Sequence, residues 1–310
     1  MPAGSSGKGE RLMYYKNARI FASDFQFHTG SFQVEDGRFG AVLYGDVPED
    51  AVDLKGATVI PGLVDAQARK PMGKLEETAK ELASWGVTAF ACAGDADEYS
   101  QIEGGSRFLG LRLENVAAES FDAFAALVKG SAFPVCMAAL PANASFLGKA
   151  SSLCSIALCD AGSSYEQARD GFAAGASFLQ DLYRYLPLVT ADAPGAIAAA
   201  VENPNVKAEL VCAQGRCHPA LARLAFAMFG AERLVLSSGG AEENLCQVLL
   251  NAIRYGIPEA DALRAATYNA ACALGAGKEI GMIAPGRKAD FVVCRSDFSG
   301  RRVFIAGEEI

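Results

Sequence analysis

The sequence is poor in histidine: its 310 residues include only His28 and His218. A metal centre that needs three imidazole ligands therefore cannot form within one chain. Cysteine offers no replacement motif, because the nine cysteines include no C-x-x-C pair and their odd number does not suit a disulfide framework. This cysteine usage is typical of a reducing compartment, so we expect a cytoplasmic protein.

Long apolar runs and basic blocks are also absent. No apolar stretch reaches the roughly 18 residues of a membrane-spanning helix, and the first residues lack the apolar core of a signal peptide. The formal net charge is −8, without a cluster of lysines and arginines, which argues against nucleic acid as a partner. The chain is 51% hydrophobic and 21% charged, which excludes disorder. We therefore predict a folded protein that binds neither a membrane nor nucleic acid.

Both ends of the chain have the pattern of short β-strands. The candidate strands are residues 12–21, 33–35, 41–44, 290–294 and 303–306, and turn signals such as Asp36-Gly37 separate them. Residues 1–10 are small and polar, and we expect a disordered tail there. The pattern predicts a small β-sandwich built from residues 11–60 and 280–310.

Between these ends, short apolar runs alternate with segments of helical periodicity. The runs are residues 58–66, 88–93, 108–113, 134–140, 153–158, 176–183, 210–212 and 233–237. Apolar strands that alternate with amphipathic helices are typical of a parallel sheet covered by helices. We therefore predict an α/β fold with a (β/α)₈ barrel over residues 61–279. The segment between the fourth and fifth runs is short for a helix.

A barrel of this kind carries its chemistry at the C-terminal ends of its strands. The polar residues and glycine found there are Gln67, Arg69, Glu114, Asp160, Asp181, Gln214, Arg216, Ser238 and Gly239. Three carboxylates, from Glu114, Asp160 and Asp181, would repel one another at a shared mouth unless positive charge lies among them. The sequence therefore predicts either a cation or guanidinium groups at this position.

If the three carboxylates lie close together, their negative charge could be neutralised in two ways. Carboxylate oxygens suit Mg²⁺, Mn²⁺ or Ca²⁺, so the acids could hold a hard divalent ion. Alternatively, arginines near the same mouth could pair with them without any metal. The candidates are Arg69, Arg112, Arg184 and Arg216. We favour the arginine-paired arrangement.

The soft ligands near the predicted mouth form a weaker candidate site. They are Cys159, Cys212, Cys217 and His218. A zinc site would need them to converge, and a cysteine nucleophile would need a histidine partner. We expect Cys212 to point into the core and His218 to open a helix, so buried, inert thiols are the preferred interpretation.

Several motifs resemble the amidohydrolase superfamily. Residues 59–65 (VIPGLVD) resemble its first barrel strand, and residues 283–293 (IAPGRKADFVV) resemble the segment that returns to the β-sandwich. Residues 108–114 (FLGLRLE), 164–175 (SYEQARDGFAAG) and 218–236 resemble the N-acetylglucosamine-6-phosphate deacetylases in particular. The motifs keep the order of that family over nearly the whole chain after residue 12.

The resemblance implies hydrolysis of an N-acetylated sugar phosphate to glucosamine 6-phosphate and acetate. In that family a divalent metal polarises the amide and activates a water, while an aspartate at the eighth strand acts as general base and acid. The family pattern has an H-x-H pair, a glutamate ligand, two histidine ligands, a phosphate-contacting histidine and a T-D-A motif. The resemblance also implies a homodimer.

This chain departs from the pattern at most functional positions. Aligned with the family's metal ligands, Gln67 and Arg69 replace the H-x-H pair, Glu114 keeps the glutamate, and Asp160 and Asp181 replace the two histidines. Among the substrate-contacting positions, Arg184 replaces an asparagine and Arg216 replaces the phosphate-contacting histidine. Gly239 replaces the catalytic aspartate. Because glycine cannot accept a proton, the ordinary mechanism of the family is lost.

We therefore predict a catalytically silent or altered relative of these deacetylases, connected with amino-sugar metabolism and without a resident cofactor. A phosphorylated amino sugar or another small anion would bind through Arg216, Arg184 and Arg69. One alternative is an active hydrolase that holds Mg²⁺, Mn²⁺ or Zn²⁺ on Glu114, Asp160 and Asp181. Another is a regulatory or interaction partner of an active paralogue.

Overall fold

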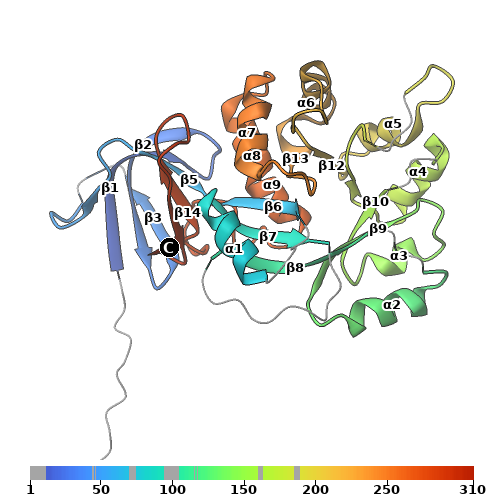
Figure 1. Cartoon of the computed structure of the whole chain (residues 1–310), viewed down its shortest axis with the longest axis horizontal. Helices are drawn as coiled ribbons and strands as arrows, with labels where there is room; N and C mark the ends of the chain where they lie inside the picture. The colour runs from blue at the N-terminus through green and yellow to red at the C-terminus, as the bar shows by residue number, and fades with distance from the viewer. Residues whose placement is uncertain are drawn as a thin grey trace, which may run out of the picture.

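The computed structural model describes residues 12–43, 45, 47–69, 75–93, 105–114, 116, 118–159, 163–184 and 189–310. Within these residues the chain forms two eight-stranded sheets, one of them surrounded by helices (Figure 1). The predicted tail, residues 1–10, lies outside the described residues. No helix in the described part of the chain combines the length and apolarity needed to cross a membrane.

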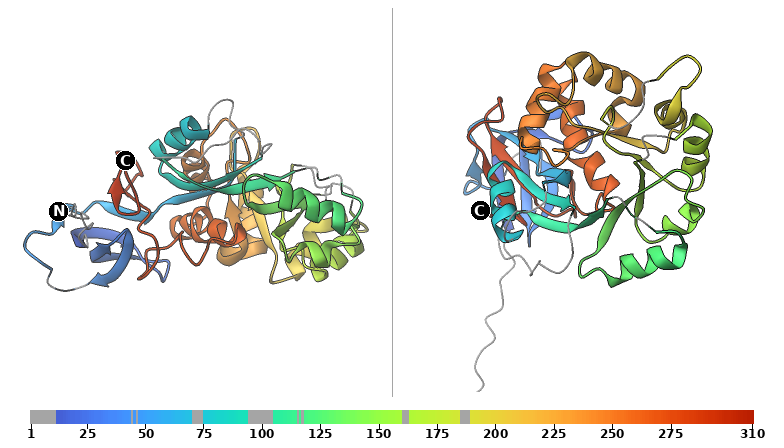
Figure 2. Two further views of the ribbon diagram at one scale, coloured as in Figure 1. Left: turned by 90° about the horizontal axis from the view of Figure 1, so that it is seen from below. Right: turned by 45° about the vertical axis from the view of Figure 1, so that its right-hand side comes forward.

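The first sheet is a nearly closed barrel of parallel strands, which confirms the predicted (β/α)₈ fold (Figure 2, right). Its strands are β6 (Leu63–Ala68), β7 (Val87–Cys92), β8 (Arg107–Leu113), β9 (Val135–Leu140), β10 (Ser155–Leu158), β11 (Phe178–Leu179), β12 (Lys207–Leu210) and β13 (Leu234–Leu236). Each strand pairs with the next in chain order from β6 to β13. All eight predicted apolar runs therefore contain or adjoin a barrel strand.

Helices cover the outside of the barrel and follow most of its strands. They are α1 (Leu75–Ser84), α2 (Phe121–Gly130), α3 (Leu147–Ala150), α4 (Tyr165–Ala173), α5 (Gly195–Glu202), α6 (Pro219–Arg233), α7 (Leu245–Arg254), α8 (Glu259–Ala266) and α9 (Tyr268–Ala273). The segment after β9 holds only the single turn of α3, as its short length indicated. His218 caps α6 by accepting a hydrogen bond from the Ala220 amide, so the expectation that it opens a helix is confirmed.

The second sheet joins both ends of the chain, as the strand patterns predicted (Figure 1). Its strands are β1 (Leu12–Phe21), β2 (Phe27–Glu35), β3 (Arg38–Leu43), β4 (Val52–Asp53), β5 (Thr58–Pro61), β14 (Phe291–Cys294), β15 (Arg302–Ile305) and β16 (Glu308–Glu309). A buried aromatic cluster supports it: the Phe291 ring stacks on Phe304 at 4.4 Å, and Tyr15 stacks on Phe32 at 4.8 Å. Strands far apart in sequence thus share one core.

The chain passes from this sheet into the barrel at Gly62. Residues before it pair in β5, and residues after it pair in β6, so the first predicted apolar run serves both sheets. A Cβ at this position would lie 1.9 Å from the Thr88 hydroxyl oxygen, which leaves room only for glycine. The close approach of β6 and β7 therefore depends on this residue.

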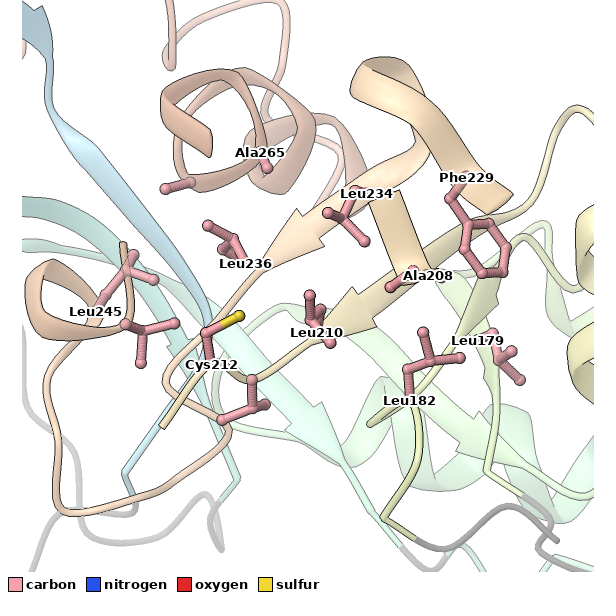
Figure 3. Close-up of a cluster of buried hydrophobic side chains, with 14 of the residues drawn as sticks. Leu179, Leu182, Ala208, Leu210, Cys212, Phe229, Leu234, Leu236, Leu245 and Ala265 are labelled. Atoms are coloured by element: carbon pink, nitrogen blue, oxygen red, sulfur yellow. The ribbon is translucent and has the colours of Figure 1, made fainter. Parts of the chain in front are cut away.

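The seventh strand begins earlier than predicted. The apolar run at 210–212 suggested a strand there, but β12 covers Lys207–Leu210. The difference arises because Glu209, a charged residue inside the strand, interrupts the apolar pattern although its side chain is fully buried. Cys212 follows the strand and is buried in the apolar cluster between the barrel and its helices, as expected (Figure 3).

The barrel closes between its first and last strands through loop contacts rather than strand pairing. The Ser238 amide donates to Asp65 Oδ1 at 3.1 Å, and the Ser238 hydroxyl donates to the Gln67 carbonyl at 3.0 Å. The Gly240 amide donates to the same carbonyl at 2.8 Å. These bonds hold the end of β13 against the end of β6, where the candidate site lies.

Candidate functional site

The interior of the barrel contains an ion pair between Arg112 on β8 and Glu209 on β12. Arg112 Nη1 and Nη2 each donate to one oxygen of the Glu209 carboxylate at 2.9 Å. Both side chains are fully buried. A parallel, two-bond pairing of this kind is the strongest geometry open to arginine and a carboxylate. The pair therefore joins two non-neighbouring strands across the barrel.

Alanines among the inward-facing side chains leave room for this pair. The interior cluster includes Val64, Ala66, Ala89, Ala91, Met137, Ala139, Ala157, Phe178 and Val235. Arg112 also donates to the Ala66 carbonyl at 3.2 Å, and its guanidinium carbon lies 5.7 Å from the centre of the Phe178 ring. Burial alone would lower the pKa of Arg112, but the attraction of Glu209 outweighs it and raises that pKa. The guanidinium is thus a fixed positive charge inside the barrel.

A second group of charges lies at the barrel mouth around Asp181, just after β11. Its Oδ2 atom accepts hydrogen bonds from Arg216 Nη2 at 2.8 Å and from Arg184 Nη1 at 3.2 Å. Asp181 has a φ of 47°, and the turn that follows brings Arg184 back to its carboxylate. The sequence predicted that arginines would pair with an acid here, and the structure brings these three residues together.

The interior pair and the mouth are joined through Glu209. Its Oε2 atom accepts a hydrogen bond from the Asp181 amide at 3.2 Å. Burial and the nearby negative charge of Glu209 raise the pKa of the Asp181 carboxyl, whereas Arg216 and Arg184 oppose that rise. The Asp181 carboxylate is 4% exposed, while Arg184 is 45% and Arg216 19% exposed. The acid is therefore buried, and its two arginines reach solvent.

Gly239, which the sequence motifs align with the catalytic aspartate of the deacetylases, lies against Arg216. Arg216 Nη1 donates to the Gly239 carbonyl at 2.8 Å. Gly239 has a φ of 61°, and a Cβ there would lie 2.5 Å from Val211 Cγ2 and 3.1 Å from Arg216 Nη1. The space next to this residue is therefore filled by a guanidinium, and no side chain fits there without movement.

Glu114 and Gln67 pair with each other near the end of β8. Gln67 Nε2 donates to Glu114 Oε1 at 2.5 Å, and Arg112 Nε lies 3.8 Å from the same oxygen. Arg112 thus lies between Glu114 and Glu209, and its side chain is buried inside the barrel rather than exposed at the mouth. The sequence does not reveal this burial, because a charged residue near a strand end can point either into the barrel or to solvent.

The remaining predicted residues that the structure describes are not brought into this group. Arg69 is exposed and lines a separate cleft, described below. Asp160 lies outside the described residues. Cys159 and Cys212 pack in different clusters, one inside and one outside the barrel wall. All nine cysteines have free thiols.

The described residues do not fit the metal that an amidohydrolase fold implies. One oxygen of Asp181 is engaged by two guanidiniums, and one oxygen of Glu114 is engaged by Gln67. The sequence motifs align Arg69 with one histidine of the H-x-H pair. A guanidinium cannot act as a ligand, because it has donors and no acceptor. Within the described ranges, no group of three histidine, cysteine, aspartate or glutamate side chains could hold a metal ion.

Sequence reasoning missed Glu209 and Asp65, although both left a signal. Each is a charged residue inside an apolar strand, and such residues are almost never fully buried unless they are paired. Asp65 Oδ1 accepts from the amides of Gln67 and Ser238, both at 3.1 Å. Burial raises the pKa of the Asp65 carboxyl. An acid and an arginine at inward positions of different strands could have indicated the internal pair.

Two comparisons of sequence place part of the chain among known proteins. Residues 199–310 match the model of the amidohydrolase family. A segment of 78 residues is 41% identical to adenine deaminase 2 of Agrobacterium fabrum and covers 24% of this chain and 12% of that protein. The match thus spans about an eighth of that relative's length.

Solved structures extend the likeness to nearly the whole chain. The N-acetylglucosamine-6-phosphate deacetylase of Pasteurella multocida superposes with a TM-score of 0.84 and 19% identity, over 97% of this chain and 100% of that one. The enzyme of Mycobacterium smegmatis gives 0.80 and 22%, over 96% and 99%. The enzyme of Thermotoga maritima gives 0.79 and 16%, over 96% and 99%.

The fold and the family match define an amidohydrolase-fold protein, with a barrel and a sheet built from both termini. Within this class the chain has the fold of the N-acetylglucosamine-6-phosphate deacetylases, which is the fold that the motif resemblance implies.

Proposed function

We propose that the protein is a non-hydrolytic relative of these deacetylases that binds a small phosphorylated ligand at its barrel mouth. The observation that carries the proposal is the position of Arg216. Its guanidinium pairs with Asp181 and with the carbonyl of Gly239, where the family has its proton-transferring aspartate. A permanent positive charge stands where the reaction of the family needs a proton acceptor.

The mouth also provides donors for an anion. A guanidinium has five N–H donors in a planar fork that matches phosphate. The contacts of Arg216 with described residues use its Nη1 and Nη2 atoms once each. Arg184 is 45% exposed beside it. The names of the structurally similar enzymes make a phosphorylated amino sugar the first ligand to test.

A calorimetric titration with N-acetylglucosamine 6-phosphate tests the binding. We expect a saturable signal with the sugar phosphate and none with N-acetylglucosamine, because the phosphate supplies the charge that the arginines recognise. Arg216→Met should weaken binding about tenfold or more, since it removes charge-assisted hydrogen bonds. The matched control is Arg302→Met, which removes an arginine from the other sheet, where it pairs with Glu309.

The same samples, supplied in turn with Zn²⁺, Mn²⁺ and Mg²⁺, test the absence of hydrolysis. We expect no release of acetate above that of a protein-free control. Metal-dependent release would contradict the proposal and favour the carboxylate-bound metal alternative. Equal binding by the sugar without phosphate would contradict the role of the arginines.

The homodimer, the cytoplasmic location and the link to amino-sugar metabolism stay predictions. Light scattering after size-exclusion chromatography would measure the mass of the assembly directly. Mixing the protein with an intact deacetylase of the same family and repeating that measurement would test the role as a partner of an active paralogue. A mass equal to the sum of the two partners supports that role, and two unchanged peaks contradict it.

A further inference from the structure

A cleft on the outside of the barrel is separate from the mouth described above. It lies between helix α1 and the loop that joins β13 to α7, beside the closure of the barrel. Its lining includes Asp65, Glu81, Trp85, Ser238 and Glu242, but none of the residues that surround Asp181. Its volume is about 180 Å³, whereas one water needs only about 10–15 Å³. The cleft therefore has room for a small organic molecule.

One residue of the lining has a buried polar atom without a hydrogen-bond partner. Asp65 Oδ1 accepts two amide hydrogen bonds, but Asp65 Oδ2 is buried and makes no hydrogen bond with any described residue. The residue has 0% of its surface exposed. A buried carboxylate oxygen without a donor is costly, and the cost falls when a ligand supplies an N–H group. The observation thus points to a ligand with a donor group.

The charges around the cleft favour a cationic donor. Four carboxylates and one guanidinium line it among the described residues, the guanidinium being that of Arg69. The Glu243 carboxylate is already used, because it accepts from the Gln214 amide and from Asn251 Nδ2, both at 3.0 Å. Glu81 and Glu242 are exposed at the rim. An ammonium group would therefore be attracted along its path to Asp65.

The remaining wall of the cleft is apolar. Leu82, Trp85 and Ala241 line it, and Trp85 is 39% exposed although it is a large hydrophobic residue. Arg301 lies over the Trp85 ring with its guanidinium carbon 5.3 Å from the ring centre. An alkyl chain attached to the ammonium would cover this apolar surface.

From this combination we propose that the cleft is a binding site for a small primary alkylamine. Its ammonium donates to Asp65 Oδ2, and its alkyl part packs against Leu82 and Trp85. The site is independent of the anion site proposed at the mouth, because the two share no residue. A failure of one proposal therefore leaves the other standing.

The fluorescence of Trp85 provides a direct test, because it is the only tryptophan in the chain. We expect a saturable change in its emission when propylamine, which is an ammonium at neutral pH, is titrated into the protein. The neutral analogue 1-propanol and the anionic analogue propionate should produce no saturable change in the emission. Binding by 1-propanol as strong as by propylamine would overturn the proposal, and so would binding of Mg²⁺ alone or no binding at all.

Asp65→Asn separates the proposed contact from general attraction. The amide keeps an oxygen for the two backbone donors but presents its own donor to the ammonium, so propylamine affinity should fall about tenfold or more. The matched control, Asp170→Asn, lies on the exposed side of α4, and affinity should not change. Unchanged affinity in Asp65→Asn would overturn the proposal.

A second variant keeps the test valid if Asp65→Asn does not fold. The double variant Glu81→Gln and Glu242→Gln removes rim charge from exposed residues, and we expect weaker propylamine binding with a smaller dependence on salt. Unchanged affinity and an unchanged dependence on salt in this variant would overturn the charge argument. Arg216→Met should bind propylamine as the unmodified protein does, which distinguishes this site from the mouth.

Discussion

The barrel contains two arginine–carboxylate groups that differ in their access to water. In the interior, Arg112 and Glu209 are both fully buried and bind each other through two bonds. At the mouth, Asp181 is buried, but its partners Arg184 and Arg216 are 45% and 19% exposed. One group is sealed from solvent, whereas the other presents guanidiniums to it.

This difference indicates different roles for the same chemistry. A sealed pair cannot exchange its partner for a ligand, so the Arg112–Glu209 pair fixes the relation of β8 to β12. A partly exposed arginine can bind an incoming anion with donors that its carboxylate does not use. The Glu209 carboxylate also accepts a hydrogen bond from the Asp181 amide. The interior pair therefore helps to hold the backbone of Asp181 in place at the mouth.

Glu209→Gln should have the largest effect on stability. It removes the carboxylate that binds the buried Arg112 through two hydrogen bonds and leaves only Glu114 nearby, at 3.8 Å. Breaking a buried pair in this way costs about 3–5 kcal/mol. Urea unfolding followed by circular dichroism would measure the loss. The matched control is Glu232→Gln, since Glu232 pairs with Arg264 but is 78% exposed, and the expected loss there is about 0–1 kcal/mol.

A double variant sharpens this comparison. Arg112→Met combined with Glu209→Leu removes both charges, and apolar residues of similar size often replace a buried pair without loss. We expect the double variant to be more stable than Glu209→Gln alone. A double variant that is less stable than the single one would contradict our view that the unpaired charge is the cause.

Leu236→Ala should destabilise the strand that leads to Gly239. Leu236 is fully buried between the barrel and its helices, near Leu210 and Ala265 (Figure 3). Removing its side chain should cost about 2–5 kcal/mol in the free energy of unfolding. Leu127→Ala, at a residue 46% exposed on α2, should change stability by no more than about 0.5 kcal/mol. Equal losses in both variants would mean that β13 is misplaced.

Gly239→Asp introduces the aspartate that the motif alignment expects at the mouth, and it should not produce deacetylase activity. The φ of 61° and the contact with Val211 make any side chain there costly, at about 1–3 kcal/mol. We expect a less stable protein that releases no acetate from N-acetylglucosamine 6-phosphate. Thermal unfolding and an acetate assay with added Zn²⁺ measure the two effects. Activity in this variant would show that Arg216 does not block the position.

Asp181→Asn should have a smaller effect than Glu209→Gln. Its two arginines reach solvent, so they remain hydrated when the carboxylate is lost, and we expect a loss of about 1 kcal/mol in urea unfolding. Removing the negative charge should also strengthen phosphate binding at the mouth. A loss as large as that of Glu209→Gln would break the distinction between the two groups.

The pH dependence of stability reports on the buried carboxyl of Asp65. Burial raises its pKa above the ordinary value of 3.8, so the folded state holds this proton more tightly than the unfolded state. Its contribution to stability is therefore present below pH 3.8 and is lost as the pH rises through the folded-state pKa. Relative to Asp65→Asn, the unmodified protein should gain stability on acidification, by at most about 1.4 kcal/mol per pH unit. A difference that does not change between pH 7 and pH 4 would contradict this.

The fold could be predicted from the sequence, because apolar runs and turn residues indicate directly which segments are buried strands and where they end. Strand β1 matches its predicted range, and the barrel matches in number and order of strands. The site followed in part: pairing of Asp181 with Arg184 and Arg216 was expected, because each stands at a strand end. The inward direction of the Arg112 and Glu209 side chains was not expected, because the register of a strand decides which face of the sheet a side chain points to. The unpartnered oxygen of Asp65 depends on loop contacts across the barrel closure, which no local pattern indicates.

The central claim is that a guanidinium holds the mouth position where the deacetylase reaction needs a base. A proton NMR time course of the protein with N-acetylglucosamine 6-phosphate and Zn²⁺ tests it most directly, because one sample reports both binding and hydrolysis. We predict saturation transfer from the protein to the sugar, with a constant N-acetyl methyl signal and no acetate. Growth of an acetate signal that depends on Zn²⁺ would contradict the account.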